Sequence, residues 1–204
     1  MKDSDEFSIL KKVFKNLGNQ YFDSSNLFIG PGDDAGLFKA KKELIFSTDT
    51  SVANVHFPKD LEPKLIAYRA CAVAASDIAA CGGKLKWLSI ALTAHNKKKK
   101  WIDEFSKGIK EFSDNYKVPI IGGDLTLGKE ISVSIGVCGE IAKKDFMRRD
   151  GAKEKDFIFV TGNLGEASIG LNLLKQKKQR LKPDEKICLK RFLKPEIDFL
   201  FSQD

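Results

Sequence analysis

The sequence lacks two features that mark membrane and exported proteins. It has no uninterrupted apolar run that approaches the roughly 18 residues of a membrane-spanning helix. The N-terminal stretch MKDSDEFSIL is acidic, and its apolar part is too short for a secretory signal peptide. We therefore expect a cytoplasmic protein without a membrane partner.

Cysteine is scarce, and its spacing argues against the common cysteine motifs. The four cysteines are far apart, form no C-x-x-C pair and have small or apolar neighbours: Cys71, Cys81, Cys138 and Cys188. This spacing favours neither a disulfide framework nor a zinc site. We predict that all of them are buried free thiols.

Two signatures of nucleotide and nucleic-acid binding are also missing. No G-x-x-x-x-G-K-[ST] segment is present, which excludes a P-loop protein. The segment GNLGEASIG matches the dinucleotide-binding fingerprint only loosely. The net charge of +7 would suit a polyanion, but no aromatic-interleaved RNA motif accompanies the lysine clusters at 96–101 and 175–180. We interpret both clusters as solvated faces and expect no nucleic-acid partner. An RNA-binding protein is the alternative, and its affinity would depend steeply on salt.

The pattern of apolar residues predicts a mixture of helices and strands. Helices are predicted over 6–16, 62–81 and 99–115, the second being rich in alanine and stopped by Gly82 and Gly83. Strands are predicted over 26–30, 35–38, 44–50, 86–94, 118–124 and 130–141, and the segment 118–124 is expected to run into a glycine turn. This order predicts an α+β fold, with an antiparallel or mixed sheet that has helices on one face.

The composition along the chain suggests a boundary near residue 142. With 204 residues, the chain has room for one domain or for one domain and part of another. We expect a first domain over 1–141 and a basic, polar linker over 142–155. Residues 156–204 then read as a strand, a glycine turn and a helix, which would begin a second α/β domain that is incomplete here.

Asp77 is the most informative single residue. It lies in AVAASDIAAC, where nearly all other residues are small and apolar, so both sides of this helix are expected to pack closely against neighbours. A carboxylate in such a place is costly unless a cation or several donors compensate it. Taken alone, Asp77 could equally cap a neighbouring element.

Other acidic residues follow predicted strands. Asp33 and Asp34 follow a glycine turn, Asp49 ends LIFSTD, and Asp124 ends VPIIGGD. Side chains at such positions can converge on one edge of a sheet, although Asp33 could simply shape its turn. The hydroxyls of Ser47, Thr48 and Thr50 flank Asp49, and no histidine or cysteine pattern lies nearby. A ligand set made of oxygens suits Mg²⁺, which usually shares its coordination with phosphates, so a nucleotide polyphosphate is implied.

Five stretches, taken in order, resemble a known enzyme family. They are GPGDDAGLF, STDTSVANVHF, AYRACAVAASDIAACGG, IIGGDLT and FIFVTGNLGEASIGL. Together they resemble the thiamine-monophosphate kinases, from an ATP-binding superfamily that also contains aminoimidazole ribonucleotide synthetase, selenophosphate synthetase and a hydrogenase maturation protein. The resemblance covers nearly the whole chain from about Phe7.

The resemblance implies roles for individual residues. The magnesium ligands would be Asp34, Ser47, Thr48, Asp49, Asp77 and Asp124. His56 would contact thiamine monophosphate, Gly123 and Asp124 would contact ATP, and Arg149 would reach the nucleotide phosphates, with Arg148 as the alternative one residue away. The family also implies a homodimer formed through the first domain.

The resemblance further implies direct transfer of the γ-phosphoryl group of ATP to the phosphate of thiamine monophosphate. No general base is expected, because a phosphate monoester with a second pKa of about 6 is mostly deprotonated at neutral pH. Several Mg²⁺ ions and an arginine would instead bring the two polyanions together.

The sequence departs from the family in its length. Motifs of the second domain that resemble DLSDGL and GGEDYEL are absent. One alternative is therefore a non-catalytic domain that binds Mg-ATP and dimerises. Another is a related synthetase, although a selenophosphate synthetase should have a reactive cysteine near its N-terminus, and none precedes Cys71.

Overall fold

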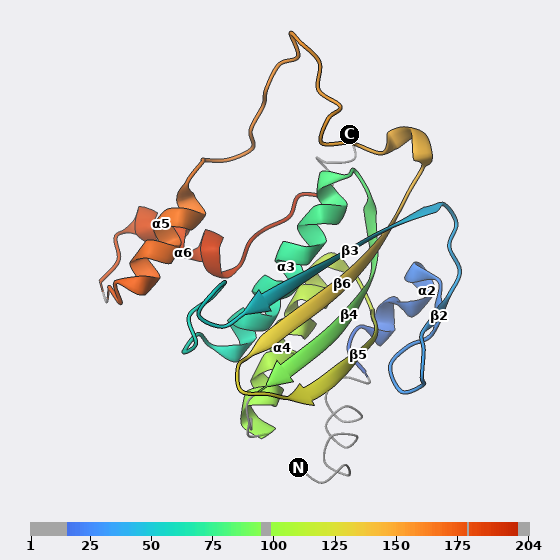
Figure 1. Ribbon diagram of the computed structural model, residues 1–204, viewed down its shortest axis with the longest axis horizontal. Coiled ribbons are helices and arrows are strands. Elements are labelled where there is room, and N and C mark those ends of the chain that lie inside the picture. Colours follow the sequence, from blue (N-terminus) through green and yellow to red (C-terminus); the bar gives the residue numbers. More distant parts are fainter. Residues whose placement is uncertain (1–15, 95–98, 179, 200–204) are drawn as a thin grey trace.

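The computed structural model describes residues 16–94, 99–178 and 180–199 (Figure 1). The helix predicted over 6–16 lies outside these residues except for Asn16. Within the described ranges, no helix combines the length and the apolar character that crossing a membrane requires.

A four-stranded mixed sheet forms the centre of the fold, with the strand order β3-β6-β4-β5. Its strands are β3 (Glu43–Val52), β4 (Lys84–Ala94), β5 (Ile120–Leu127) and β6 (Ser132–Ile141). Strand β4 runs parallel to β5, whereas β6 is antiparallel to both β3 and β4. A second, two-stranded sheet pairs β1 (Leu27–Ile29) with β2 (Leu37–Phe38), and the Phe38 ring packs on Trp87 of β4 with centroids 4.0 Å apart. The predicted α+β class and mixed sheet are confirmed.

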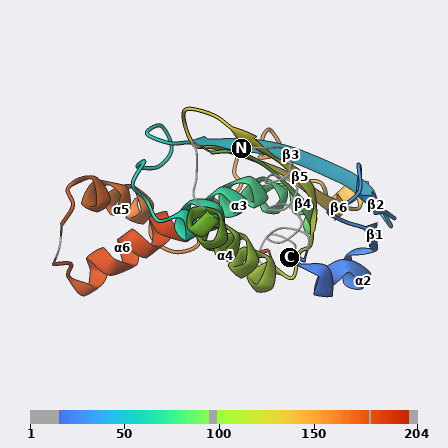
Figure 2. The same ribbon diagram turned by 90° about the horizontal axis from the view of Figure 1, so that it is seen from below.

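Two long helices, α3 (Pro63–Ala80) and α4 (Lys99–Tyr116), cover one face of the four-stranded sheet (Figure 2). Both match the predicted helices closely. α3 ends in a Schellman motif, in which Gly82 has φ 78° and the N–H groups of Gly82 and Gly83 donate to the carbonyls of Ala79 and Ile78. α4 buries its apolar side almost completely, at Ile102, Phe105, Ile109 and Phe112. The core therefore lies between the helices and the sheet.

The two helices approach each other most closely at Gly108 of α4. A Cβ atom at this position would overlap the carbonyl oxygen of Lys64 in α3 and would lie 2.8 Å from the Cβ of Ala67. The absence of a side chain at Gly108 is therefore what permits the spacing between the helices.

The glycine turn predicted after Ile121 is wrong. Residues 120–127 form one continuous strand, because β4 supplies a parallel partner for Gly122, Gly123 and Asp124. Gly123 fits this position because a Cβ atom there would overlap the backbone of Ile90. Tertiary pairing thus overrides the local preference of glycine for turns.

The strand predicted at the start of the last segment is also wrong. Residues 156–160 are not assigned to any strand, although the predicted helix after the glycines is present as α5 (Glu166–Lys175). α5 packs on α6 (Pro183–Leu193) at one side of the sheet (Figure 1). The remaining short helical elements are η2 (Asn19–Tyr21), α2 (Phe22–Ser25) and η3 (Lys143–Asp145).

The described cysteines are all free thiols, as predicted. Cys71 and Cys188 are buried, whereas Cys81 and Cys138 are only half-buried, so the predicted burial is correct for two of them. Burial raises the pKa of Cys71 to about 12 and that of Cys138 to about 11, which keeps both protonated at neutral pH.

The segment after α6 is tied to the helical layer by polar contacts. Glu111 of α4 forms ion pairs with Lys64 of α3 and with Lys194. The guanidinium of Arg69 donates a 3.0 Å hydrogen bond to the carbonyl oxygen of Phe192 and stacks on its ring. The backbone N–H of Ile197 donates a 2.9 Å hydrogen bond to the Tyr116 hydroxyl. These contacts join residues 192–197 to α3 and α4.

The Glu111 carboxylate should make this attachment sensitive to acid. Burial by itself raises the pKa of Glu111, but hydrogen bonds from Lys194 and Lys64 outweigh it and lower the pKa below its ordinary value of 4.5. Stabilisation by Glu111 is therefore fully present above the ordinary value and disappears as the pH falls through the lowered pKa. We expect Glu111→Gln to cost about 1 kcal/mol of unfolding free energy at neutral pH and almost nothing in strong acid.

Urea denaturation at neutral and acidic pH measures this difference. Glu104→Gln is the control, since the partner of Glu104 is Lys107 on the exposed surface of the same helix. An equal cost of Glu111→Gln at both pH values would show that its ion pairs do not stabilise the fold.

Candidate active site

The contact between β3 and α3 brings two of the predicted ligands together. The hydroxyl of Ser47 donates a hydrogen bond of 2.6 Å to Oδ2 of Asp77. The small residues around Asp77, such as Ala74 and Ala75, are fully buried and let the helix lie close to the sheet. Asp77 therefore has a hydroxyl partner in the middle of a strand, which is not a helix-capping interaction.

Asp49 lies on the same face of β3 as Ser47, because side chains two residues apart in a strand share a face. Its pairing partner in β6 is Ile135, whose side chain belongs to the core. Among the described residues, neither Asp49 nor Asp77 forms an ion pair with a lysine or arginine, and both are half-buried. Asp49 and the Ser47 hydroxyl of β3 thus share the sheet face on which Asp77 of α3 packs, and neither acid has a compensating lysine or arginine among the described residues.

Thr48 and Asp124 lie on the opposite face of the sheet. Thr48 is adjacent to Ser47 in β3 and so points the other way. Asp124 is in register with Ala91, which pairs with Ser134, and Ser134 in turn contacts Thr50 on the face away from the helices. The Thr126 hydroxyl donates a 3.0 Å hydrogen bond to Asp124.

The expectation that these acids stand at strand ends and converge on one edge is therefore not met within one chain. Asp49 and Asp124 are interior residues of β3 and β5, which are the two opposite edge strands of the sheet. Over 16–94, 99–178 and 180–199, no three acidic, histidine or cysteine side chains cluster closely enough to hold a metal ion.

The turn between β1 and β2 holds the paired acids. The backbone N–H of Asp34 donates a 2.8 Å hydrogen bond to Oδ1 of Asp33, so Asp33 shapes the turn. Gly36 of the same turn packs directly against Ile121 at the start of β5. The exposed Asp34 is thus carried on the β5 side of the sheet, away from Asp49 and Asp77.

His56 closes the turn that follows β3. Its backbone N–H donates to the carbonyl of Val52 at 2.9 Å, and the Val52 N–H donates to Nδ1 of its ring at 3.0 Å. With Nδ1 as an acceptor, the neutral imidazole has its hydrogen on Nε2. Nε2 is therefore the ring atom that can donate to a ligand.

The two neighbouring arginines after η3 differ in their contacts. Nε and Nη2 of Arg148 donate to the two carboxylate oxygens of Asp150 at 2.9 and 3.2 Å. Arg149 is exposed and has no such partner among the described residues. The structure thus distinguishes two arginines that the sequence could not separate.

A cleft of about 660 Å³ lies at the N-terminus of α5. Its lining comes from the glycine-containing segment 161–167, from Arg191 and from residues 195–198. None of the predicted site residues lines it. The glycines of TGNLGEA were the only sequence signal for this cleft, and glycine turns of this kind are common.

Comparisons with known proteins agree with the resemblance. The family model described as AIR synthase related protein, N-terminal domain, matches residues 32–141. The thiamine-monophosphate kinase of Buchnera aphidicola subsp. Schizaphis graminum is 42% identical over 195 residues, which cover 93% of this chain and 58% of that relative. The chain therefore spans about three-fifths of the length of this curated relative.

Solved structures show the same fold at moderate identity. The thiamine-monophosphate kinase from Stenotrophomonas maltophilia K279a superimposes with a TM-score of 0.80 at 31% identity, over 87% of this chain and 58% of that one. The structure described as AaThiL complexed with AMPPCP and TMP gives a TM-score of 0.75 at 31% identity, over 84% of this chain and 55% of that one.

Proposed function

The chain belongs to the family of AIR synthase related proteins, and from this premise we propose that it binds Mg-ATP and phosphorylates thiamine monophosphate to thiamine diphosphate. The relatives that are named thiamine-monophosphate kinases and the AaThiL complex with AMPPCP and TMP support this substrate pair. The observation that carries the proposal is the group formed by Ser47, Asp49 and Asp77, which has carboxylates but no paired cation among the described residues.

This group suits magnesium in its chemistry. Its donors are carboxylate and hydroxyl oxygens, the ligands that Mg²⁺ prefers, and Mg²⁺ commonly takes only one or two protein carboxylates beside water and phosphate oxygens. We propose that Ser47, Asp49 and Asp77 hold one such ion. Bound there, Mg²⁺ would neutralise charge on the phosphates of ATP.

The other residues would orient the two anionic substrates. Nε2–H of His56 would donate to thiamine monophosphate, because Val52 fixes the opposite ring nitrogen as an acceptor. Gly123 and Asp124 would contact ATP, and Arg149 would contact its phosphates. No general base is needed, because the acceptor phosphate is mostly ionised at neutral pH, with a second pKa of about 6.

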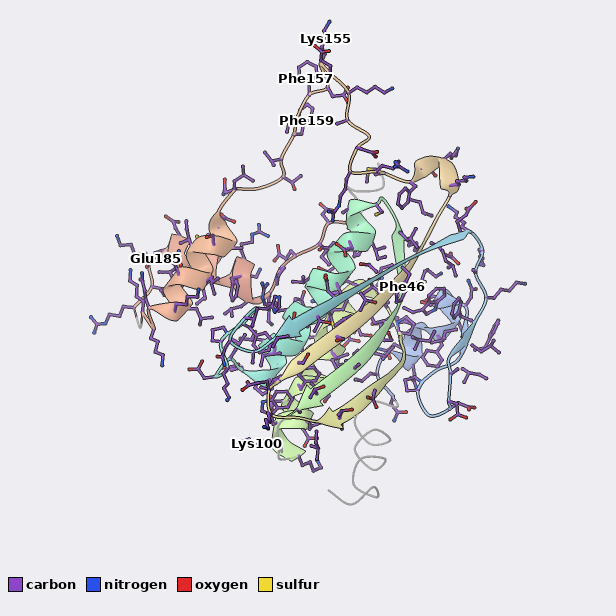
Figure 3. All side chains as sticks on the ribbon, viewed as in Figure 1. Phe46, Lys100, Lys155, Phe157, Phe159 and Glu185 are labelled. Atoms are coloured by element: carbon purple, nitrogen blue, oxygen red, sulfur yellow. The ribbon has the colours of Figure 1, made fainter. Side chains whose placement is uncertain are left out.

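We also propose that two copies pair through the sheet face that α3 and α4 leave uncovered. On this face Phe46 is 70% exposed and Leu44 is 45% exposed. Figure 3 labels Phe46 on the central sheet. Large apolar side chains at such exposure are typical of interaction surfaces when they occur together. Pairing through this face would place the proposed ligands Thr48 and Asp124 at the interface, while Asp34 would complete the set from its turn.

A non-catalytic domain that binds Mg-ATP is the second candidate. The match to 58% of the Buchnera relative favours it, because the unmatched part could supply further contacts. Incubation of the chain with Mg-ATP and thiamine monophosphate, followed by chromatography for thiamine diphosphate, tests the kinase. Calorimetry with Mg-ATP tests binding alone, and absence of both product and binding would overturn both candidates.

Arg149 should matter more for nucleotide binding than Arg148. We expect Arg149→Ala to weaken Mg-ATP binding about tenfold or more, since a hydrogen bond to a charged group contributes about 1.5–3 kcal/mol. Arg148→Ala is the matched control, and we expect less than about a threefold change because Arg148 is already engaged by Asp150. Calorimetric titration of both variants checks this. A larger loss in Arg148→Ala would reverse the assignment.

A further inference from the structure

The chain between the turn of Asp34 and the start of β3 crosses one end of the sheet face that α3 and α4 leave uncovered. We call its residues 36–41 the strap. The strap lies in turn on Ile121 of β5, on Trp87 of β4 and on Glu140 of β6, which is the order of these strands in the sheet. It then enters β3. The strap therefore links the turn that carries Asp34 to the strand that carries two of the other proposed ligands.

A buried ion pair lies beneath the end of the strap. Lys86 of β4 is 6% exposed and Glu140 of β6 is 8% exposed, and Nζ of Lys86 lies 3.7 Å from Oε2 of Glu140. The other carboxylate oxygen, Oε1, accepts a 2.8 Å hydrogen bond from the backbone N–H of Lys41 in the strap. Among the ion pairs of the described residues, this one is the most deeply buried. Lysine and glutamate are almost never buried so deeply unless they are paired.

The pair lies on the side of the sheet away from the helices. Gly139, the neighbour of Glu140, faces α3, because a Cβ atom there would lie 2.6 Å from Cγ2 of Ile78. Adjacent residues of a strand point to opposite faces, so Glu140 points to the face on which the strap lies. The strap thus covers the pair on this face, and lifting the strap would expose both charges to water.

The two charges depend on each other more than the fold depends on them. The cost of removing two charges from water offsets most of their attraction, so a buried ion pair can often be replaced by uncharged groups without loss of stability. Loss of one partner is different, because the remaining charge is then buried without compensation. Opening of the strap would hydrate that charge. The closed position of the strap is therefore tied to the presence of both partners.

We propose that Glu140 and Lys86 are positioning residues that fix the strap and thereby set the position of Asp34 for magnesium. This inference rests on the proposed function, in which Asp34 is one of the magnesium ligands. The turn of Asp34 is held internally by the hydrogen bond from its N–H to Asp33. Its placement beside the sheet depends on the segments that flank it, and the strap begins only two residues after Asp34.

Hydrogen exchange of the full 204-residue chain tests the contact between the pair and the strap. We expect the amides of residues 37–41 to exchange at least about tenfold faster in Glu140→Gln and in Lys86→Met, because each variant leaves one buried charge unpaired and favours local opening. The double variant removes both charges, and its glutamine oxygen still accepts the N–H of the strap. Exchange in the double variant should return to within about threefold of the unmodified chain. Glu130→Gln is the matched control, since Glu130 pairs with Lys59 at an exposed site.

Calorimetric titration with ATP at a series of Mg²⁺ concentrations tests the positioning role. We expect Glu140→Gln to raise the Mg²⁺ concentration needed for half-maximal ATP binding about tenfold, the lower end of the range for groups that support metal ligands. In an Asp34→Asn chain the same change should have less than about a twofold effect, because the ligand that the strap positions is already lost. A general loss of stability would instead weaken binding equally in both backgrounds.

The outcomes separate this inference from the proposed function. If the unmodified chain binds no Mg-ATP, the proposed function fails and the positioning role fails with it. If it binds Mg-ATP but Glu140→Gln has the same effect with and without Asp34, the positioning role alone is overturned. Unchanged exchange at 37–41 in both single variants, or exchange that stays fast in the double variant, would also overturn it.

Discussion

Replacing Asp77 with asparagine is expected to weaken Mg-ATP binding by more than about 100-fold and to abolish any formation of thiamine diphosphate. The side chain keeps its size, and its amide oxygen still accepts the hydrogen bond from Ser47, so the contact between α3 and β3 should survive. The negative charge that would hold magnesium is lost. Changes outside the ligand shell already reduce metal affinity by about 10- to 100-fold, and removal of a ligand should exceed this.

The comparison uses Asp103→Asn as a control. Asp103 of α4 is half-buried, and among the described residues its carboxylate forms an ion pair with Lys99 alone, so its replacement should leave binding unchanged. Calorimetry with Mg-ATP, with and without a chelator, measures the effect directly. If Asp77→Asn binds Mg-ATP as well as the unmodified chain, the group of Ser47, Asp49 and Asp77 is not the magnesium site.

Replacing Gly108 with alanine is expected to destabilise the fold by about 3 kcal/mol, the upper part of the range for overpacked cores. In an exposed helix the same change would stabilise by about 1 kcal/mol, because alanine favours helix formation. Here the new Cβ would overlap the carbonyl oxygen of Lys64, and backbone cannot move aside as a flexible side chain does. The two helices would have to separate.

Urea denaturation shows whether Gly108→Ala lowers or raises the free energy of unfolding. Gly122→Ala in β5 provides the comparison, because nothing lies within 4 Å of a Cβ built there, and a small change is expected. An increase in stability for Gly108→Ala would mean that α3 and α4 can move apart without loss, contrary to their close packing.

The fold was largely predictable where local pattern and tertiary environment agree. Helices α3 and α4 were found from alanine content, apolar spacing and terminal glycines. The prediction failed at Gly122 and Gly123, because a strand partner in β4 can stabilise glycine in a ladder that its local preference does not indicate. It failed again at Phe157–Val160 for the opposite reason, since a strand needs a partner that the described residues do not supply.

The candidate site was predictable in its residue types but not in its geometry. The sequence placed Ser47, Thr48 and Asp49 together, although alternation along a strand sends Thr48 to the opposite face. The faces of Asp49 and Asp124 depend on the register of all four strands, which no local pattern determines. The distinction between Arg148 and Arg149 likewise depended on where Asp150 lies.

Residues 192–197 are attached to α3 and α4. The segment between the end of β6 and these residues is therefore fixed at both of its ends. The chain leaves the central sheet at the end of β6 and passes through α5 and α6 before it returns to the helical layer (Figure 1). The contact of Phe192 with Arg69 marks the return. For a flexible loop fixed in this way, the entropy cost rises only with the logarithm of its length, about 0.6 kcal/mol for each doubling. Variation in the length of the exposed connection before α5 is therefore compatible with an unchanged central sheet and helical layer, because the contact of Glu111 with Lys194 holds the chain after α6 in place.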